Sequence, residues 1–154
     1  MKKDISSISR KVLFLCTGNS CRSQMAEAIV STQLPNDWLA FSAGTKPTGE
    51  VHPLVIKVLA EINIQHEGRS KSITEFINQD FDLVVTICDS AAEDCPVWLK
   101  SGRQIHHSFP DPEAFNGNPE ETLAVFRQVR DDILQEIPRL LRNINSESSQ
   151  DGTS

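Results

Sequence analysis

A short polar loop between a buried strand and a helix constrains the fold of this chain more than any other feature. Residues 12–15 (Val-Leu-Phe-Leu) form a continuous apolar run within a strand predicted over residues 11–15, and such runs are typical of strands that are buried on both faces. Residues 23–30 then space their apolar side chains as one face of a helix. The loop between them, Cys-Thr-Gly-Asn-Ser-Cys-Arg, should therefore lie at the carboxyl end of a strand, where α/β proteins bind their ligands.

The rest of the chain continues this alternation of strands and helices. Alternating elements of this kind predict a three-layer α/β fold, with a mostly parallel sheet and helices on both faces. We predict further strands over residues 38–42, 81–87 and 104–108, and helices over residues 53–62, 72–78 and 119–143.

This pattern divides the chain into three parts. Residues 1–10 are polar and should form a flexible extension, residues 11–143 a single catalytic domain, and residues 144–154 a disordered polar tail.

Composition excludes several classes of function. The chain has 154 residues and a formal net charge of −6, which argues against a nucleic-acid-binding protein because these usually present a basic surface. It contains no apolar run long enough for a secretory leader or a membrane span. We therefore expect a cytoplasmic protein, in which its four cysteines are more often buried, metal-bound or catalytic than permanently paired.

Cys16 and Arg22 stand at the two ends of the loop. The loop amides and the helix N-terminus can converge on one anion and favour the thiolate form of Cys16, and Arg22 can hold two oxygens of a tetrahedral oxyanion. Gly18 and Asn19 are residue types that tolerate a left-handed backbone, and Ser23 can donate a hydrogen bond to the thiolate. The alternative is a buried structural cysteine near a chance arginine. The predicted oxyanion-binding residues are Thr17, Gly18, Asn19, Ser20, Cys21, Arg22 and Ser23.

The segment CTGNSCRSQMAEA resembles the signature of the low-molecular-weight protein tyrosine phosphatase superfamily, which includes thioredoxin-coupled arsenate reductases. The resemblance covers about residues 11–142. It implies a four-stranded parallel sheet of flavodoxin-like topology. Because phosphatases and reductases of this superfamily share the loop, the loop alone does not separate them.

The two remaining cysteines favour a reductase. Cys88 follows the clearest predicted strand and Cys95 lies seven positions later, which matches the spacing of the shuttle pair in the reductases. A phosphatase needs one thiol, whereas reduction of arsenate needs two electrons that thiols can supply by forming a disulfide. Incidental cysteines or a structural zinc site are the alternatives, but zinc sites usually space paired cysteines more closely. The chain also has no tyrosine, whereas the eukaryotic-type phosphatases of this superfamily carry tyrosines near their general acid.

Asp111-Pro112 resembles the general-acid loop of the superfamily. A carboxylic acid there can protonate the oxygen that leaves arsenate, although Asp and Pro are also common in ordinary turns.

The resemblance implies a complete redox cycle. Cys16 attacks arsenate, Cys88 attacks Cys16 to release arsenite, and Cys95 attacks Cys88 to leave a Cys88–Cys95 disulfide for thioredoxin. The expected partners are arsenate, with phosphate or sulfate as competing anions, and thioredoxin, with no cofactor bound. A phosphatase of aryl phosphates, which would use only Cys16, Arg22 and Asp111, and a non-enzymatic thiol sensor remain as alternatives.

Some members bind potassium beside the loop, and we expect no metal here because Ser72 stands where those members have an aspartate. The other matching positions are Asn19, Glu27, Ser42 and Ser70.

Overall fold

A four-stranded parallel sheet forms the centre of the computed structural model, which describes residues 10–88 and 102–151. Within those residues the strands are β1 (Arg10–Cys16), β2 (Trp38–Gly44), β3 (Leu83–Thr86) and β4 (Arg103–His106). They are ordered β2-β1-β3-β4, and all pairs are parallel. The predicted α/β class and flavodoxin-like strand order are confirmed, whereas the predicted extension over residues 1–10 lies almost entirely outside the described residues.

The two faces of the sheet bury alternate residues of the same strands, because successive side chains in a strand point in opposite directions. On one face, Val12 and Phe14 of β1 pack in a large core with the helices. On the other, Leu13 and Leu15 pack with Phe76 and Phe81 in a smaller core. All four strand residues are 0% exposed, which explains why β1 is apolar along its centre.

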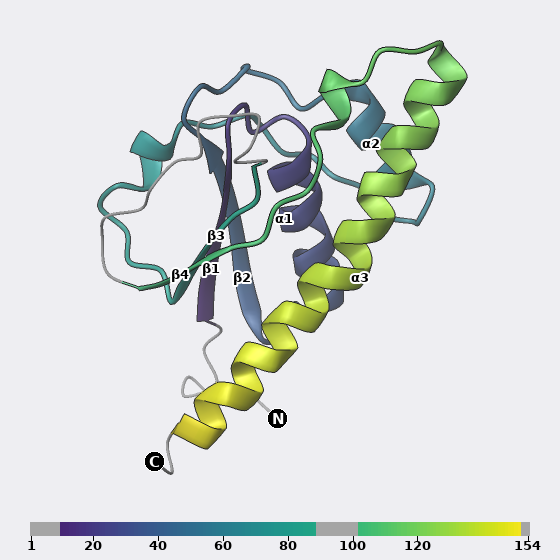
Figure 1. Ribbon diagram of the computed structural model, residues 1–154. Coiled ribbons are helices and arrows are strands. Elements are labelled where there is room, and N and C mark those ends of the chain that lie inside the picture. Colours follow the sequence, from purple (N-terminus) through teal and green to yellow (C-terminus); the bar gives the residue numbers. More distant parts are fainter. Residues whose placement is uncertain (1–9, 89–101, 152–154) are drawn as a thin grey trace.

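The long helices lie together on one face of the sheet (Figure 1). They are α1 (Arg22–Gln33), α2 (Pro53–Ala60) and α3 (Pro119–Asp151). Within the described residues, the opposite face is covered by the short 3₁₀ helix η2 (Ile73–Phe76). No helix in this part of the chain is both long and apolar enough to cross a lipid bilayer.

Two predicted elements differ from the structure. The helix predicted over residues 72–78 is a four-residue 3₁₀ helix, because the β-branched Ile73 and Thr74 favour a longer α-helix less than unbranched residues do. The helix predicted to end at residue 143 continues to Asp151, whereas the predicted disorder of the tail stays a prediction. The apolar stripe of α3 extends to the buried Ile144, and residues 144–151 contain no glycine or proline, so adding turns costs less than starting a helix.

The carboxyl ends of β1 and β2 meet beneath the Cys16–Arg22 loop. Cys16 is opposite Gly44 in the register of the two strands. A Cβ atom at Gly44 would lie 2.4 Å from the carbonyl oxygen of Thr17 and 3.0 Å from the amide nitrogen of Asn19. Only glycine lets β2 approach the loop this closely.

Replacing Gly44 by alanine should therefore destabilise the fold by about 1–3 kcal/mol, because the backbone rather than a side chain must move to make room. It should also weaken phosphate binding, since the displaced atoms belong to the loop. Urea unfolding and titration calorimetry with phosphate measure the two effects.

Gly117→Ala is the matched control, because its added Cβ would meet only the side chains of Phe115 and Glu121. Equal losses in the two variants would show that the contact with the loop is not what requires Gly44.

Candidate functional site

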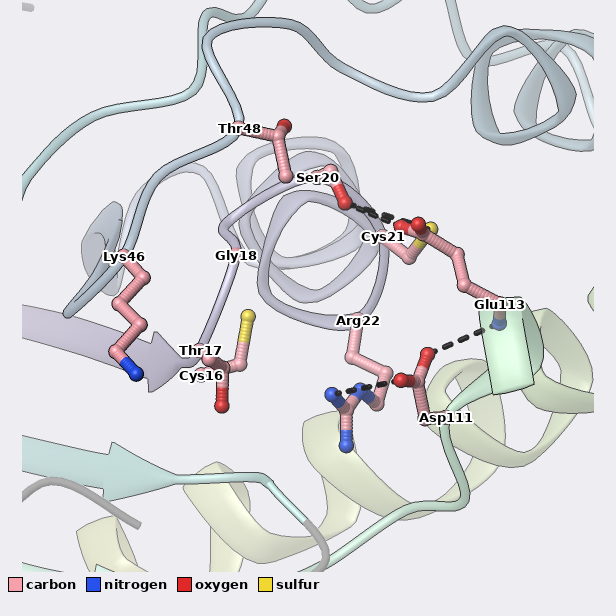
Figure 2. A pocket seen from close by; sticks show the side chains of 10 residues that line it. All are labelled: Cys16, Thr17, Gly18, Ser20, Cys21, Arg22, Lys46, Thr48, Asp111 and Glu113. Atoms are coloured by element: carbon pink, nitrogen blue, oxygen red, sulfur yellow. Dashed lines mark hydrogen bonds and ion pairs between the residues drawn. The ribbon is translucent and has the colours of Figure 1, made fainter. Parts of the chain in front are cut away.

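A pocket of about 230 Å³ opens where the loop between β1 and α1 faces the segment after β4 (Figure 2). It contains Cys16, Arg22 and Asp111, which the sequence predicts to share a site. It also contains side chains that the sequence analysis missed. The lining residues are Cys16, Thr17, Gly18, Ser20, Cys21, Arg22, Lys46, Thr48, Asp111 and Glu113.

The backbone carbonyls of the loop are held by hydrogen bonds from surrounding segments. Because the C=O of one residue and the N–H of the next point in opposite directions across a planar peptide, carbonyls that face outward leave amides that face inward. Within the described residues, no side chain caps the first turn of α1, and that turn contains no acidic residue. The loop and helix amides can therefore bind an anion in the pocket. The donors are Lys46 N to Thr17 O (2.9 Å), Thr48 N (3.1 Å) and Ser70 Oγ (2.9 Å) to Gly18 O, Gln24 Nε2 to Asn19 O (3.1 Å), and His52 N to Ser20 O (3.0 Å).

The thiol of Cys16 is 1% exposed at the base of this pocket. Its Sγ lies 2.8 Å from Ser23 Oγ, which is the predicted contact. Asn19 Nδ2 donates to the same oxygen at 2.7 Å. Since that oxygen already accepts from Asn19, the hydroxyl hydrogen of Ser23 can point to Cys16. Ser23 can therefore donate a hydrogen bond to the sulfur of Cys16.

Asn19 connects the loop to the segment before η2. Its φ angle is 51°, in the left-handed region that asparagine tolerates better than most residues. Its Oδ1 accepts from Lys71 N at 2.7 Å and from Gln24 Nε2 at 2.9 Å. Gly18 does not adopt a positive φ, so of the two residue types that tolerate a left-handed backbone only Asn19 uses it.

Arg22 and Asp111 lie next to each other at one side of the pocket (Figure 2). Arg22 is 4% exposed, and its Nη2 lies 3.9 Å from Asp111 Oδ2. Its Nη1 donates to the carbonyl of Phe109 at 3.2 Å. Asp111 is the N-cap of the short 3₁₀ helix η3 (Pro112–Ala114) and accepts from Glu113 N at 2.9 Å. One carboxylate oxygen of Asp111 thus belongs to a structured turn, and the other, Oδ2, faces Arg22 in the pocket.

Glu113 and Cys21 form a contact that no sequence motif indicated. Cys21 Sγ donates to Glu113 Oε2 at 3.0 Å, and Ser20 Oγ donates to the same oxygen. Burial and the adjacent Glu113 carboxylate raise the pKa of Cys21 well above its usual range. Desolvation raises the pKa of Glu113, but hydrogen bonds from Cys21 and Ser20 outweigh it, so that the pKa is lowered. At neutral pH this pair is a thiol and a carboxylate.

Cys88 follows β3, the neighbour of β1. Leu15 is opposite Thr86 in the register, and Ile87 N donates to Leu15 O at 2.9 Å. The register places Ile87 beside Cys16, and Cys88 is the next residue. Neighbouring strands lie about 4.8 Å apart. Cys88 is 0% exposed. Cys95 lies outside the described residues, so its predicted pairing with Cys88 stays a prediction.

A lysine lies among the positions that match the potassium site. Lys71 Nζ is 3.7 Å from Glu27 Oε1 and 3.5 Å from Ser42 Oγ. It also donates to the carbonyl of Arg69 at 2.8 Å, and burial lowers its pKa. Within residues 10–88 and 102–151, no group of three or more His, Cys, Asp or Glu side chains is arranged to hold a metal ion.

Replacing Asn19 by alanine should weaken phosphate binding by roughly 10-fold, because buried hydrogen bonds worth about 1–3 kcal/mol are lost and the left-handed backbone loses its support. Isothermal titration calorimetry measures this affinity. Asn63→Ala is the control, because Asn63 also has a positive φ of 65° but lies after α2 rather than in the Cys16–Arg22 loop. The proposed role of Asn19 is wrong if both variants bind phosphate equally well.

A family model, related sequences and solved structures all place this chain in the same protein family. Residues 11–150 match the low molecular weight phosphotyrosine protein phosphatase family. The chain is 44% identical to an arsenate reductase of Halalkalibacterium halodurans over 128 residues, which are 82% of this chain and 91% of that protein. It is 40% identical to an arsenate reductase of Bacillus subtilis over 123 residues, which are 79% and 88% of the two chains. A solved arsenate reductase in a phosphate-binding state superposes with a TM-score of 0.72 at 30% identity, over 88% of this chain and 98% of the other. The chain therefore belongs to the low molecular weight phosphotyrosine protein phosphatase family.

Proposed function

We propose that this protein reduces arsenate to arsenite in the Cys16 pocket and that thioredoxin regenerates it. The observation that carries the proposal is the position of Cys88, which follows the strand directly beside the one that ends at Cys16. A phosphatase would need no second thiol there, whereas a reductase must bring one to the arsenic-bearing sulfur. The arsenate reductases that resemble this chain over most of its length support the same conclusion.

The proposed reaction begins with addition to arsenic. The Cys16 thiolate forms a sulfur–arsenic bond, and an oxygen leaves after Asp111 protonates it. Arg22 and the inward-facing amides hold the remaining oxygens, which are negatively charged throughout. Lys46, at the other side of the pocket, adds a further positive charge.

Electrons move in the next two steps. The Cys88 thiolate attacks Cys16 Sγ, the sulfur–arsenic bond breaks, and its electron pair reduces As(V) to As(III), which leaves as arsenite. Cys95 then attacks Cys88 and releases the Cys16 thiolate. Thioredoxin reduces the Cys88–Cys95 disulfide, so one arsenate consumes two electrons. Because Cys88 is fully buried, this sequence requires Cys88 to become accessible before thioredoxin can reach the disulfide.

A coupled assay with thioredoxin, thioredoxin reductase and NADPH tests the proposal. NADPH consumption in proportion to added arsenate is expected. Hydrolysis of an aryl phosphate without arsenate-dependent NADPH consumption would instead identify a phosphatase. Reversible thiol oxidation without either activity would identify a redox sensor.

The relay gives distinct results for two cysteine variants. Cys95→Ser should release about one arsenite per enzyme and then stop, because the Cys16–Cys88 disulfide is not transferred outward. Cys88→Ser should release none, because nothing attacks the sulfur–arsenic adduct. Mass spectrometry of the trapped protein and quantification of arsenite measure both outcomes. Sustained turnover of Cys95→Ser with thioredoxin would rule out the relay.

Asp111→Asn separates acid catalysis from binding. The variant should form arsenite about 10²–10⁴-fold more slowly in a single turnover, because the leaving oxygen is no longer protonated. Its affinity for phosphate should change little, because Arg22 and the loop amides remain. Rapid-quench kinetics and calorimetry measure the two quantities, and a large loss of phosphate affinity with an unchanged rate would contradict the assignment.

A further inference from the structure

Glu113 joins the turn that carries Asp111 to the loop that carries Cys16. Its carboxylate accepts hydrogen bonds from two loop residues, Ser20 and Cys21. Both donors are buried, at 6% and 3% exposure, whereas the carboxylate reaches them from the rim of the pocket. Figure 2 shows that Glu113 and Asp111 come from the same short turn and point to different parts of the loop.

The segment from residue 109 to residue 113 is attached to the loop on both sides of Asp111. Before Asp111, the guanidinium of Arg22 donates to the carbonyl of Phe109 at 3.2 Å. After it, Glu113 accepts from Ser20 and Cys21. When an oxyanion fills the pocket, Arg22 also has to donate hydrogen bonds to that anion. The guanidinium then divides its hydrogen bonds between the oxyanion and the carbonyl of Phe109. The attachment through Glu113 does not involve the oxyanion.

The protonation states suit this attachment. The pKa of Glu113 is lowered and that of Cys21 is raised, so the contact is a neutral donor on an ionised acceptor. Such charge-assisted hydrogen bonds are about twice as strong as those between neutral groups. A cysteine kept as a thiol is also a poor nucleophile, so Cys21 is suited to donate a hydrogen bond and unsuited to the redox relay.

We propose that Glu113 is a positioning residue that holds Asp111 over the oxyanion pocket, and that Cys21 serves it as a hydrogen-bond donor. The role of Asp111 as acid belongs to the proposed function, on which this inference rests. The link itself, from Cys21 and Ser20 through Glu113 to the turn of Asp111, is a separate property of the structure.

A double-mutant cycle with Glu113→Ala and Asp111→Asn tests the link through the rate of arsenite formation in a single turnover. Glu113→Ala should lower this rate by at least about 10-fold, because a misplaced acid loses much of its catalytic contribution. It should have no further effect in the Asp111→Asn background, since residues in one network are not additive. An equal loss in both backgrounds, or no loss in the single variant, would overturn the proposal.

Conservative variants distinguish positioning from a simple effect of charge. Glu113→Gln keeps an oxygen that can accept from Ser20 and Cys21, and it should recover much of the rate lost in Glu113→Ala. If the charge of Glu113 acted directly on the bound oxyanion, both variants would strengthen phosphate binding to the same extent and show the same rate. Cys21→Ser, which keeps a donor, should likewise exceed Cys21→Ala in rate.

An infrared measurement tests the hydrogen bond without any activity. The S–H stretching band assigned to Cys21, by difference from Cys21→Ala, should move to higher frequency in Glu113→Ala because the thiol loses its acceptor. An unmoved band overturns the proposal. If the wild-type protein shows no arsenate-dependent turnover, the proposed function fails by itself, and the same cycle is then measured by hydrolysis of phenyl phosphate.

Discussion

The outward direction of the loop carbonyls is the constraint on which the rest of the site depends. Five backbone or side-chain donors from three segments hold the carbonyls of residues 17–20, and the inward amides follow from the planarity of the peptide. None of these donors has to move when an anion enters. The site is therefore organised before binding, which is how enzymes obtain electrostatic stabilisation without reorganising during the reaction.

This arrangement explains how a chain with a net charge of −6 can hold an oxyanion. The protein does not need a basic surface, because amides, a helix N-terminus and the buried Arg22 act over a few ångströms within a partly desolvated pocket. Two carboxylates, Asp111 and Glu113, stand beside this positive region. Asp111 lies close to Arg22, while Glu113 is occupied by Ser20 and Cys21, so the two acidic groups have different surroundings and can serve different purposes.

The thiols of the described site differ in their partners. Cys16 contacts the hydroxyl of Ser23, which can donate a hydrogen bond to its sulfur. Cys21 contacts the carboxylate of Glu113, which favours the thiol form of Cys21. Two cysteines only five positions apart thus have different hydrogen-bond partners, a hydroxyl for Cys16 and a carboxylate for Cys21. In the proposed relay, Cys16 reacts with arsenic, Cys88 attacks it from the next strand, and Cys21 contributes through a hydrogen bond.

The sequence by itself determined the strand–loop–helix unit, the parallel sheet and the residues Cys16, Arg22 and Ser23, because these depend on local hydrophobic patterns and on short spacings. Asp111 was indicated by the resemblance of Asp111-Pro112 to the general-acid loop of the superfamily. Only the tertiary structure decided which side chains complete the pocket. Lys46, Thr48 and Glu113 reach it from segments whose positions are set by the sheet and by the turn after β4, and no spacing along the chain encodes such a meeting. The same holds for the pairing of Cys21 with Glu113, which lie 92 positions apart. The end of α3 also differs from the predicted helix end at residue 143, because the polar composition that follows is not typical of a packed helix whereas α3 continues to Asp151.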